Sequence, residues 1–531
     1  MVRLMVNRAR RSNAISIVAP IGGLNDKDSI ADMPAKDALI LDNWFPGTQS
    51  VDVRGGSSEF ATGAPAVIET LMVYNGIANN KIAAVANGSI YDITAGGTFP
   101  AAALSGMSNS RFDWVNFANS GASYLVAVNG ADLPRFYNGT SWTFSGLTYA
   151  PAITGVAATT FSQVNVWKNR LFFVQKNTLS CWYLGTGAIG GAAAELNFGG
   201  VAKLGGALIA TATITTSAGT TPDDYFVAIT SEGECLVYRG TDPTSITTFF
   251  LVGNYRIGRP IANGIDNQGG RWLAKLGSDI VAITADGFTT LQDMLNNDVV
   301  ASQRTINGKI INSVTTAVSR WSSNFGWQIL LCPFQNKLFV NVPTSEGTQA
   351  YQYVMNTITG AWTRFQGWNA TCFAYSKDKI YAAIGTKVYQ VDLARSNDFV
   401  TSTYTGDVIN ATAKTAFMYL GGRNKLKSYK MVRPLLLAGG DPSPLVNINV
   451  NLEDKPIVGV ASVSTSSSAS RWDTALWDIT GIWVADEGYF QNWVSVSGLG
   501  YSVALKIQIQ TDNNKCRWLG WDAMYEAGGL I

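Results

Sequence analysis

Short apolar runs that end in turn residues recur along most of this chain. From Lys81 the sequence KIAAVANGSIYDIT reads as an apolar strand, a turn and a second strand that carries an aromatic residue. Units of the same kind begin at Tyr124, Asn169, Tyr225, Asp279, Lys337 and Lys379. Runs rich in Val, Ile, Tyr, Phe and Thr between glycines and asparagines are typical of short strands joined by turns, so the pattern predicts an all-β fold.

The spacing of these units favours one β architecture over another. Consecutive units begin 42 to 58 residues apart, close to the ~40–50 residues of a four-stranded propeller blade. We therefore expect a β-propeller of about seven blades over residues 63–395, because neighbouring blades cover each other's sheet faces and ring closure leaves few free edges. The repeated segments are expected to be the inner strands of the blades. A run of unrelated hairpins in a β-sandwich is the alternative.

The regions on either side of the repeat have different patterns. Residues 1–62 are expected to form an N-terminal arm and platform segment, and residues 396–531 a C-terminal β domain. In the latter, a Ser-rich loop at 462–470 precedes a Trp-dense stretch at 471–493. The segment ALKIQIQ from Ala504 alternates apolar and polar residues at the period of a strand. The C-terminal flank is therefore interpreted as a second all-β domain.

Two segments have a helical rather than a strand-like pattern. In residues 32–42, Asp32 can cap a helix and Pro34 can occupy its first turn. Apolar residues then recur at helical spacing through Leu41. A weaker helical pattern spans about residues 298–318. We expect one short helix in the N-terminal segment and a second one here.

The charge composition narrows the class of protein. Charged residues make up 14% of the chain and apolar residues 47%, against about 25% charged residues in a typical soluble domain. No run reaches the ~18 apolar residues of a membrane-spanning helix, so no stable membrane insertion is expected. Large subunit interfaces explain the deficit better, since they exclude Lys, Glu and Asp and favour aromatic residues. The net charge of +2 indicates that any contact with nucleic acid is local or weak.

The sequence contains no histidine, which excludes several classes of enzyme mechanism for this chain. Ser-His-Asp and Cys-His nucleophile systems and His-ligated zinc all need an imidazole as base or ligand. The five cysteines are odd in number, lie tens of residues apart and form no CxxC pair. We expect them to be reduced core residues of a protein assembled in a cytoplasm. The basic residues Arg3, Arg8, Arg10 and Arg11 precede no apolar stretch of a secretory signal.

Acidic and glycine-rich patterns predict no catalytic, cofactor or metal site. The sequence DGF at 286–288 lacks the spacing of an Asp-box. Close acidic pairs such as Asp223 and Asp224 fall at strand starts or turns, where capping roles are usual. Residues 25–29 lack the glycine and the terminal glutamate of a calcium loop. We therefore expect no enzyme activity and no cofactor.

One basic pattern is a candidate contact for DNA. Arg423, Lys425 and Lys427 alternate with Asn424 and Leu426, so in a strand the three cations would share one face. A row of cations repeated around a ring would guide a DNA backbone by screened attraction that is independent of base sequence. A solvated strand face is the alternative.

Four long stretches of sequence resemble a known family. They are APIGGLNDKDSIADMPAKDALILDNWFPGTQSVDVRGG from Ala19, SQVNVWKNRLFFVQKNTLSCWYL from Ser162, DDYFVAITSEGECLVYRGTDP from Asp223 with LVGNYRIGRP from Leu251, and QYVMNTITGAWTRFQGWNA from Gln352. In content and order they resemble the tail nozzle (tail tubular) proteins of short-tailed, podovirus-type bacteriophages. The resemblance covers nearly the whole chain.

The resemblance implies a structural role in the virion. Related nozzle proteins form six-membered rings below a portal and an adaptor, and each subunit has a β-propeller and platform-like β regions. By resemblance we expect a homo-hexamer in the viral tail that contacts the adaptor protein and fibre or tail-tip proteins. Double-stranded DNA would pass through its channel during genome ejection. The alternative is a propeller-bearing receptor-binding or glycan-degrading tail component.

Overall fold

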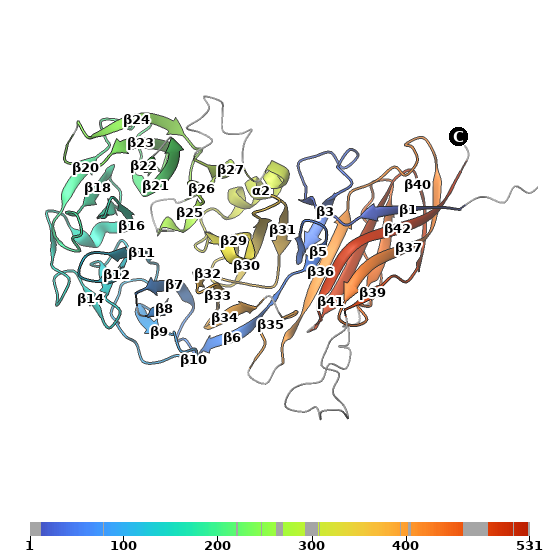
Figure 1. Ribbon diagram of the computed structural model, residues 1–531, viewed down its shortest axis with the longest axis horizontal. Coiled ribbons are helices and arrows are strands. Elements are labelled where there is room, and N and C mark those ends of the chain that lie inside the picture. The colour runs from blue at the N-terminus through green and yellow to red at the C-terminus, as the bar shows by residue number, and fades with distance from the viewer. Residues whose placement is uncertain are drawn as a thin grey trace, which may run out of the picture. The chain divides into compact units, whose positions relative to one another are not determined.

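The chain divides into two compact units in the computed structural model (Figure 1). The structure describes residues 12–77, 79–218, 221–245, 247–261, 269–291, 306, 308–392, 395–401, 405–459, 487–512 and 514–528. Unit 1 comprises Met1–Ser58, Val354–Gln366 and Asp392–Ile531, and unit 2 comprises Glu59–Tyr353 and Gly367–Val391. The short segment Val354–Gln366 thus leaves the repeat region and joins unit 1, which nothing in the hydrophobic pattern indicates.

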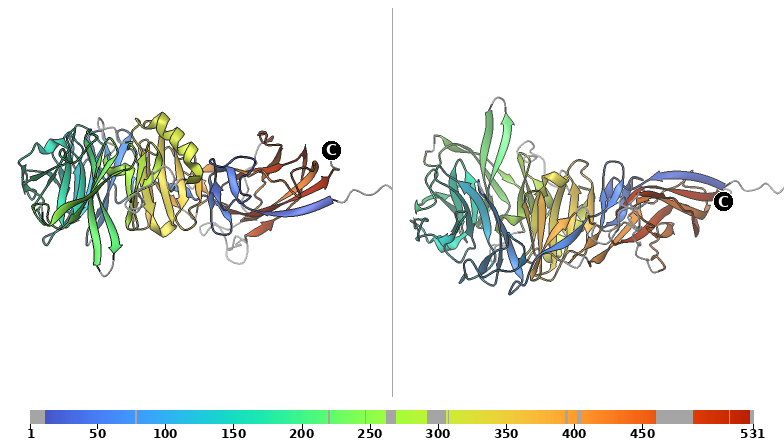
Figure 2. Two further views of the ribbon diagram at one scale, coloured as in Figure 1. Left: turned by 90° about the horizontal axis from the view of Figure 1, so that it is seen from above. Right: turned by 60° about the horizontal axis from the view of Figure 1, so that its bottom comes forward.

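Unit 2 is a β-propeller whose described strands form seven blades, besides the short parallel pair of β15 (Ile153–Thr154) and β19 (Gly191–Ala192) (Figure 1 and Figure 2). The first four sheets are β7 (Ile68–Asn75), β8 (Asn80–Ala86) and β9 (Ser89–Asp92); β11 (Asp113–Ala118), β12 (Ser123–Val128), β13 (Arg135–Tyr137) and β14 (Trp142–Phe144); β16 (Phe161–Trp167), β17 (Arg170–Gln175), β18 (Ser180–Tyr183) and β20 (Ala194–Asn197); and β21 (Leu208–Ala218), β22 (Thr221–Thr230), β23 (Glu234–Gly240) and β24 (Phe249–Arg256). The last three are β25 (Leu273–Leu276), β26 (Asp279–Thr284) and β27 (Gly287–Thr290); β28 (Gln328–Cys332), β29 (Lys337–Ser345) and β30 (Gln349–Asn356); and β32 (Cys372–Ser376), β33 (Lys379–Ile384) and β34 (Lys387–Asp392).

The sheets of unit 2 close into a ring. Contacts between neighbouring sheets run from β7 to β11, β16 and β21, then through the β25–β27 sheet to β28, β32 and back to β7. β6 (Gly56–Thr62) precedes the first sheet in the chain but pairs with β34 of the last sheet. The β6 strand therefore joins the beginning of the propeller to its end. The prediction of an all-β fold built on a β-propeller is confirmed.

The repeated segments are the second strands of the sheets, not the inner ones. The segments that start at Lys81, Tyr124, Asn169, Tyr225, Asp279, Lys337 and Lys379 fall on β8, β12, β17, β22, β26, β29 and β33. The prediction that they are the inner strands is wrong. The inner strand of each sheet is the first one, because it is the strand that contacts the neighbouring sheets around the ring. Second strands are covered on both faces, so they carry the most continuous apolar runs, whereas first strands such as β16 also carry Gln163 and Asn165.

Side chains packed between adjacent sheets form the core of unit 2. Trp167 and Phe172 of the third sheet pack with Phe226 and Phe249 of the fourth in one apolar cluster. Similar clusters lie between the first and second sheets and between the second and third. Each sheet therefore depends on its neighbours to bury its faces, as the propeller architecture requires.

Small elements complete unit 2 in its described part. The α-helix α2 (Ile311–Trp321) contacts β27 and β29. It confirms the helix expected over residues 298–318 where that range is described, and residues 298–305 and 307 lie outside the described part. The short elements are η1 (Ala158–Thr160), η2 (Gly269–Trp272), η4 (Gly308–Ile310), η5 (Pro333–Gln335), β10 (Gly97–Thr98), β15 (Ile153–Thr154) and β19 (Gly191–Ala192).

Unit 1 consists of two sheets. One has the order β39 (Gly488–Phe490), β37 (Lys427–Ala438), β42 (Cys516–Ala527), β5 (Val51–Val53) and β4 (Trp44–Pro46), with β1 (Ser12–Val18) paired to β42 and β40 (Val494–Gly500) paired to β37. The other contains β31 (Trp362–Phe365), β3 (Asp37–Asp42), β36 (Asp407–Thr415), β41 (Val503–Thr511) and β38 (Leu445–Val450), with β2 (Gly23–Leu24) paired to β3 and β35 (Asn397–Asp398) to β36.

Alternating burial along β37 and β41 shows that each sheet of unit 1 buries one face. The strand pattern of ALKIQIQ is confirmed as part of β41. The predicted Ser-rich loop at 462–470 and residues 471–486 of the Trp-dense stretch lie outside the described residues. So do Arg3, Arg8, Arg10 and Arg11 of the basic N-terminus.

The helix expected over residues 32–42 is not formed. A turn in which the Asp37 amide donates to the Pro34 carbonyl is followed by the strand β3 instead. β3 pairs with β36 on one side and with β2 and β31 on the other. A helix of this length is marginal by itself, so backbone pairing on both edges outweighs the helical spacing of the apolar residues.

A fully buried ion pair links distant parts of unit 1. The guanidinium of Arg54 donates from Nη1 and Nη2 to the two carboxylate oxygens of Asp398, at 2.8 and 2.5 Å. Its Nε donates to Asn43 Oδ1 at 2.9 Å, and the carbonyls of Gly55 and Gln366 each accept a hydrogen bond at 3.0 Å. The two charged side chains are 1% and 5% exposed, so the charge is compensated entirely by protein groups.

All five cysteines are buried and unpaired, which confirms that they are core residues. Burial raises the pKa of the Cys372 thiol to about 11 and the pKa values of Cys235 and Cys332 to about 12. At neutral pH these thiols are therefore protonated, and the thiolate is the reactive form.

Thiol titration of the native and the unfolded protein should give different results. At pH 8 the native chain should react with a disulfide reagent only over hours, because the thiols are buried and protonated. In denaturant without reductant all five cysteines should react. If only three thiols, or one, reacted in denaturant, one or two disulfides would be present and the assignment of five free thiols would be contradicted.

Candidate functional site

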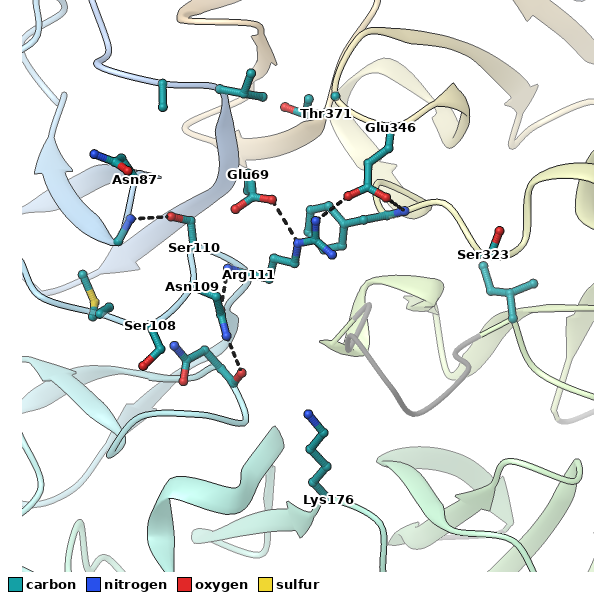
Figure 3. Close-up of a pocket in the computed structure, with 18 of the residues that line it drawn as sticks. Glu69, Asn87, Ser108, Asn109, Ser110, Arg111, Lys176, Ser323, Glu346 and Thr371 are labelled. Atoms are coloured by element: carbon teal, nitrogen blue, oxygen red, sulfur yellow. Dashed lines mark hydrogen bonds and ion pairs between the residues drawn. The ribbon is translucent and has the colours of Figure 1, made fainter.

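A pocket of about 1130 Å³ opens in unit 2 where the first strands of several sheets begin (Figure 3). Its walls come from the segments that precede β7, β11, β28 and β32 and from the turns that follow β8, β12 and β29. The first strands surround the axis of the ring, so the pocket lies at one end of that axis. We call it the axial pocket.

Arg111 joins two carboxylates on one wall of the axial pocket (Figure 3). Its Nε donates to Glu69 Oε1 at 2.9 Å, and its Nη2 donates to Glu346 Oε1. The second oxygen of Glu346 accepts the backbone amide of Phe325 at 3.2 Å. Burial opposes the charge of Arg111, but the hydrogen bonds and charges of both glutamates outweigh it and raise the pKa of Arg111.

This arrangement does not fit a glycosidase pair. Such an enzyme needs one carboxyl group that stays protonated as a general acid and a second that is free as nucleophile or base. Here Glu69 and Glu346 both bond the same guanidinium, and Glu346 also accepts the Phe325 amide, so neither carboxyl group is free for these roles. The pair therefore acts as a clamp that joins β7 to the β29–β30 turn.

Phe325, also on the pocket wall, is held by two cations. The guanidinium carbons of Arg111 and Arg271 lie 4.3 and 4.8 Å from the centre of its ring. Arg271 also donates from Nη2 to Thr70 Oγ1, and burial lowers the pKa of Arg271. Because Phe325 is 5% exposed, its ring has no free face on which a ligand could stack.

Lys176 is the cation of the axial pocket that has no carboxylate partner in the described part of the chain. It follows β17, and Figure 3 shows its side chain directed toward the wall that carries Arg111. Ser322 and Ser323, which follow α2, and Asn87 after β8 also line the pocket and have no side-chain hydrogen bond among the described residues. These groups retain hydrogen-bonding capacity, in contrast to the clamp.

Arg423, Lys425 and Lys427 do not form one exposed row. Gly421 and Gly422 have φ values of 74° and 124°, so the chain turns before it enters β37, and β37 begins only at Lys427. The strand alternation expected for the three cations is therefore wrong. Arg423 and Lys425 are exposed, whereas Lys427 is buried.

The buried Lys427 ammonium is satisfied by backbone groups. Its Nζ donates to the carbonyls of Gly422, Lys425 and Tyr501 at 2.8, 2.9 and 2.9 Å. Burial lowers the pKa of Lys427. It fastens the turn before β37 and has no donor left for a phosphate.

The exposed Arg423 side chain also has partners within the chain. It forms an ion pair with Asp32, and its guanidinium carbon lies 4.7 Å from the centre of the Tyr419 ring. Of the three predicted cations, Lys425 is the one with an exposed side chain and no side-chain partner among the described residues.

The fourth sheet of unit 2 ends in an apolar edge strand. β24 pairs with β23 and ends the order of its sheet. Its residues Phe250, Leu251 and Val252 are 49%, 38% and 44% exposed. No charged residue or proline interrupts this stretch, although free edge strands of soluble proteins usually carry such residues.

Two kinds of site are missing from the described part of the chain. No group of three or more Cys, Asp or Glu side chains there could hold a metal ion. No described helix is both long and apolar enough to span a bilayer.

No family model and no curated protein matches this chain. Among solved structures, similarity is found to Raptor from Chaetomium thermophilum, with 11% identity and a TM-score of 0.38 over 64% of this chain and 29% of Raptor. A structure of BBS1N in complex with ARL6DN has 10% identity and a TM-score of 0.40, over 64% of this chain and 98% of that one. YCF48 bound to D1 peptide has 12% identity and a TM-score of 0.29, over 52% of this chain and 80% of that one.

The sequence did not reveal the axial pocket. Glu69 and Glu346 lie 42 and 235 residues from Arg111, and each is an isolated charge in its own segment. A signal was present only in the segment Ser108-Asn109-Ser110 before β11, a polar run inside an apolar repeat.

Proposed function

We propose that this chain is a structural, non-enzymatic subunit of the tail nozzle of a short-tailed bacteriophage. Six copies form a ring below the portal and adaptor, contact fibre or tail-tip proteins, and surround a channel for double-stranded DNA. The long sequence resemblances support this role, and a propeller combined with a second β unit is the architecture that they imply. The observation that carries the proposal is the apolar edge of β24.

The β24 edge has the features of a subunit interface. Exposed apolar patches on soluble proteins mark sites of protein association, and a free edge strand also offers unpaired backbone amides and carbonyls. Phe250, Leu251 and Val252 provide both features together. In the ring a neighbouring copy covers this edge, which also accounts for the low charge content of the chain.

The channel is expected to hold DNA weakly. The net charge of +2 suits a conduit, because a densely basic lumen would retain phosphates by counterion release. Of the three cations considered, Lys425 is the main proposed channel-facing residue; Arg423 is exposed but paired with Asp32, and Lys427 is fully occupied by carbonyl groups.

Replacement of Phe250 with aspartate should abolish assembly of the ring. The charge would have to be buried against the neighbouring copy, which is costly without a partner. The measurement is electron microscopy of the purified protein together with its mass in solution. Wild-type protein should give six-fold rings, and Phe250→Asp should give monomers.

Phe334→Asp is the matched control, because Phe334 is an exposed phenylalanine of the same unit and lies on η5 instead of β24. It should assemble like the wild type. Wild-type particles without six-fold symmetry would overturn the nozzle assignment. Equal assembly of both variants would place the interface elsewhere.

A second function, as a propeller-bearing receptor-binding component of the tail, is favoured by one observation. The axial pocket is a concave site that contains carboxylates, as such a component would need. Three-fold spikes in place of six-fold rings would favour this candidate.

A further inference from the structure

We infer that the axial pocket binds an acidic saccharide without hydrolysing it, with Lys176 as the anchor for the sugar carboxylate. The inference concerns unit 2 by itself and does not depend on the ring. It rests on which polar groups of the pocket already have hydrogen-bond or ion-pair partners and which do not.

Apart from Glu69 Oε2, the polar groups of the clamp already have partners. Arg111 is paired with both Glu69 and Glu346, so the clamp keeps an excess of negative charge, and Asn109 accepts the Arg111 amide at 3.0 Å and donates to the Asn129 carbonyl at 3.3 Å. A ligand cannot take these groups without breaking existing bonds. This wall therefore shapes the site and does not attract charge.

Other groups around the pocket, on more than one wall, remain free and are of mixed character (Figure 3). Lys176 supplies an ammonium, Ser322 and Ser323 supply hydroxyls, and Asn87 supplies an amide that is exposed. Glu69 Oε2 accepts no hydrogen bond among the described residues. Such a set of donors and acceptors matches sugar hydroxyl groups, each of which both donates and accepts.

The charge distribution selects a ligand whose negative charges are singly charged groups that lie well apart. A carboxylate can reach the Lys176 ammonium and form a charge-assisted hydrogen bond. A compact dianion would also face the carboxylates of Glu69 and Glu346, which repel it. A saccharide with one carboxylate per ring and neutral hydroxyls elsewhere avoids this repulsion.

The apolar wall residues argue against a peptide. Met107, Ile261 and Phe325 are at most 7% exposed and Val67 is 37% exposed, so among the large apolar side chains that line the pocket only Val67 is open to an amino-acid side chain. Binding would then depend on hydrogen bonds and on Lys176. Both carboxyl groups of the clamp are held by Arg111, and hydrolysis needs a carboxyl pair placed on either side of the glycosidic bond, so the ligand should be held unchanged.

The test is calorimetric titration of the full chain with trigalacturonic acid, with its neutral trimethyl ester and with triglutamate. The trisaccharide acid should bind saturably, and the ester and triglutamate should each bind at least tenfold more weakly. Chromatography of the recovered trisaccharide should show no cleavage. Binding at this pocket does not depend on the symmetry of the particle. A failure to bind the saccharide would therefore contradict only this inference, and an absence of six-fold rings would contradict only the nozzle assignment.

Lys176→Met should weaken binding of the acid at least tenfold and leave binding of the ester unchanged. Lys203→Met is the matched control, since Lys203 is an exposed lysine of the same unit that does not line the pocket. It should bind like the wild type. Absence of saturable binding, equal binding of acid and ester, equal binding of triglutamate, or unchanged binding by Lys176→Met would each overturn the inference.

Discussion

Replacing Arg54 with methionine should lower the free energy of unfolding of unit 1 by about 3–5 kcal/mol. The change removes the cation and leaves the Asp398 carboxylate buried without its partner, and a buried charge left in this way costs that much. It also frees acceptors on Asn43, Gly55 and Gln366. Since whole domains are stable by about 5–15 kcal/mol, much of the stability of the unit would be lost.

Hydrogen exchange of peptides that contain β5, β31 and β35 measures this effect locally. Arg517→Met is the matched control, because Arg517 lies in the same unit and pairs with Asp52 at 3.1 Å while both side chains are nearly half exposed. An exposed pair contributes about 0–1 kcal/mol, so exchange should change little. Equal effects of the two substitutions would show that burial of the Arg54 pair does not determine its contribution.

Replacing Phe249 with alanine should lower the stability of unit 2 by about 3–5 kcal/mol, as is usual for a buried aromatic residue. The Phe249 ring stacks on Tyr238 with centroids 4.9 Å apart. It also meets Trp167 at 5.5 Å and Phe226 at 6.0 Å. The truncation would therefore leave a cavity between the third and fourth sheets, where neither sheet can move without losing other contacts.

The adjacent residue provides the control. Phe250 is half exposed, so Phe250→Ala should change the stability of the isolated chain by less than ~1 kcal/mol. Urea unfolding monitored by circular dichroism compares the two variants under conditions where the chain is monomeric. If Phe250→Ala were as destabilising as Phe249→Ala, the β24 edge would belong to the core of the subunit and not to an interface.

The fold was predictable because a local sequence pattern repeats along the propeller region, once for each of the seven blades. Each second strand carries an apolar run followed by a turn and an aromatic strand, and seven such runs are enough to indicate a ring of sheets. The first strands were missed because polar residues such as Gln163 interrupt them, and Gln163 is buried through hydrogen bonds to Thr211 that a sequence cannot reveal.

The errors of the sequence analysis have a common cause. The segment that became β3 has helical spacing, and its neighbours β36 and β31 come from residues more than three hundred positions later in the chain. Lys427 has the alternation of a surface strand, but carbonyl groups from Gly422 and Tyr501 enclose it. For β3 the deciding backbone groups are distant in the sequence, and for Lys427 they are the carbonyls of the preceding turn together with that of Tyr501, 74 residues later. Neither set of contacts can be read from the alternation of residue types.

The closure of the propeller by β6 has a consequence for the timing of synthesis. Glu59 at the start of the ring forms an ion pair with Lys387, 328 residues later in the chain. At about 5–20 residues per second the ribosome needs roughly 15–65 s to complete that interval. Throughout this time β6 lacks its partner β34 and can pair only with the two-residue β10, and the blades already made form an open arc, so nascent chains are exposed to edge-to-edge association. Chaperone contact during translation should therefore fall on β6 and should end when β34 leaves the ribosome.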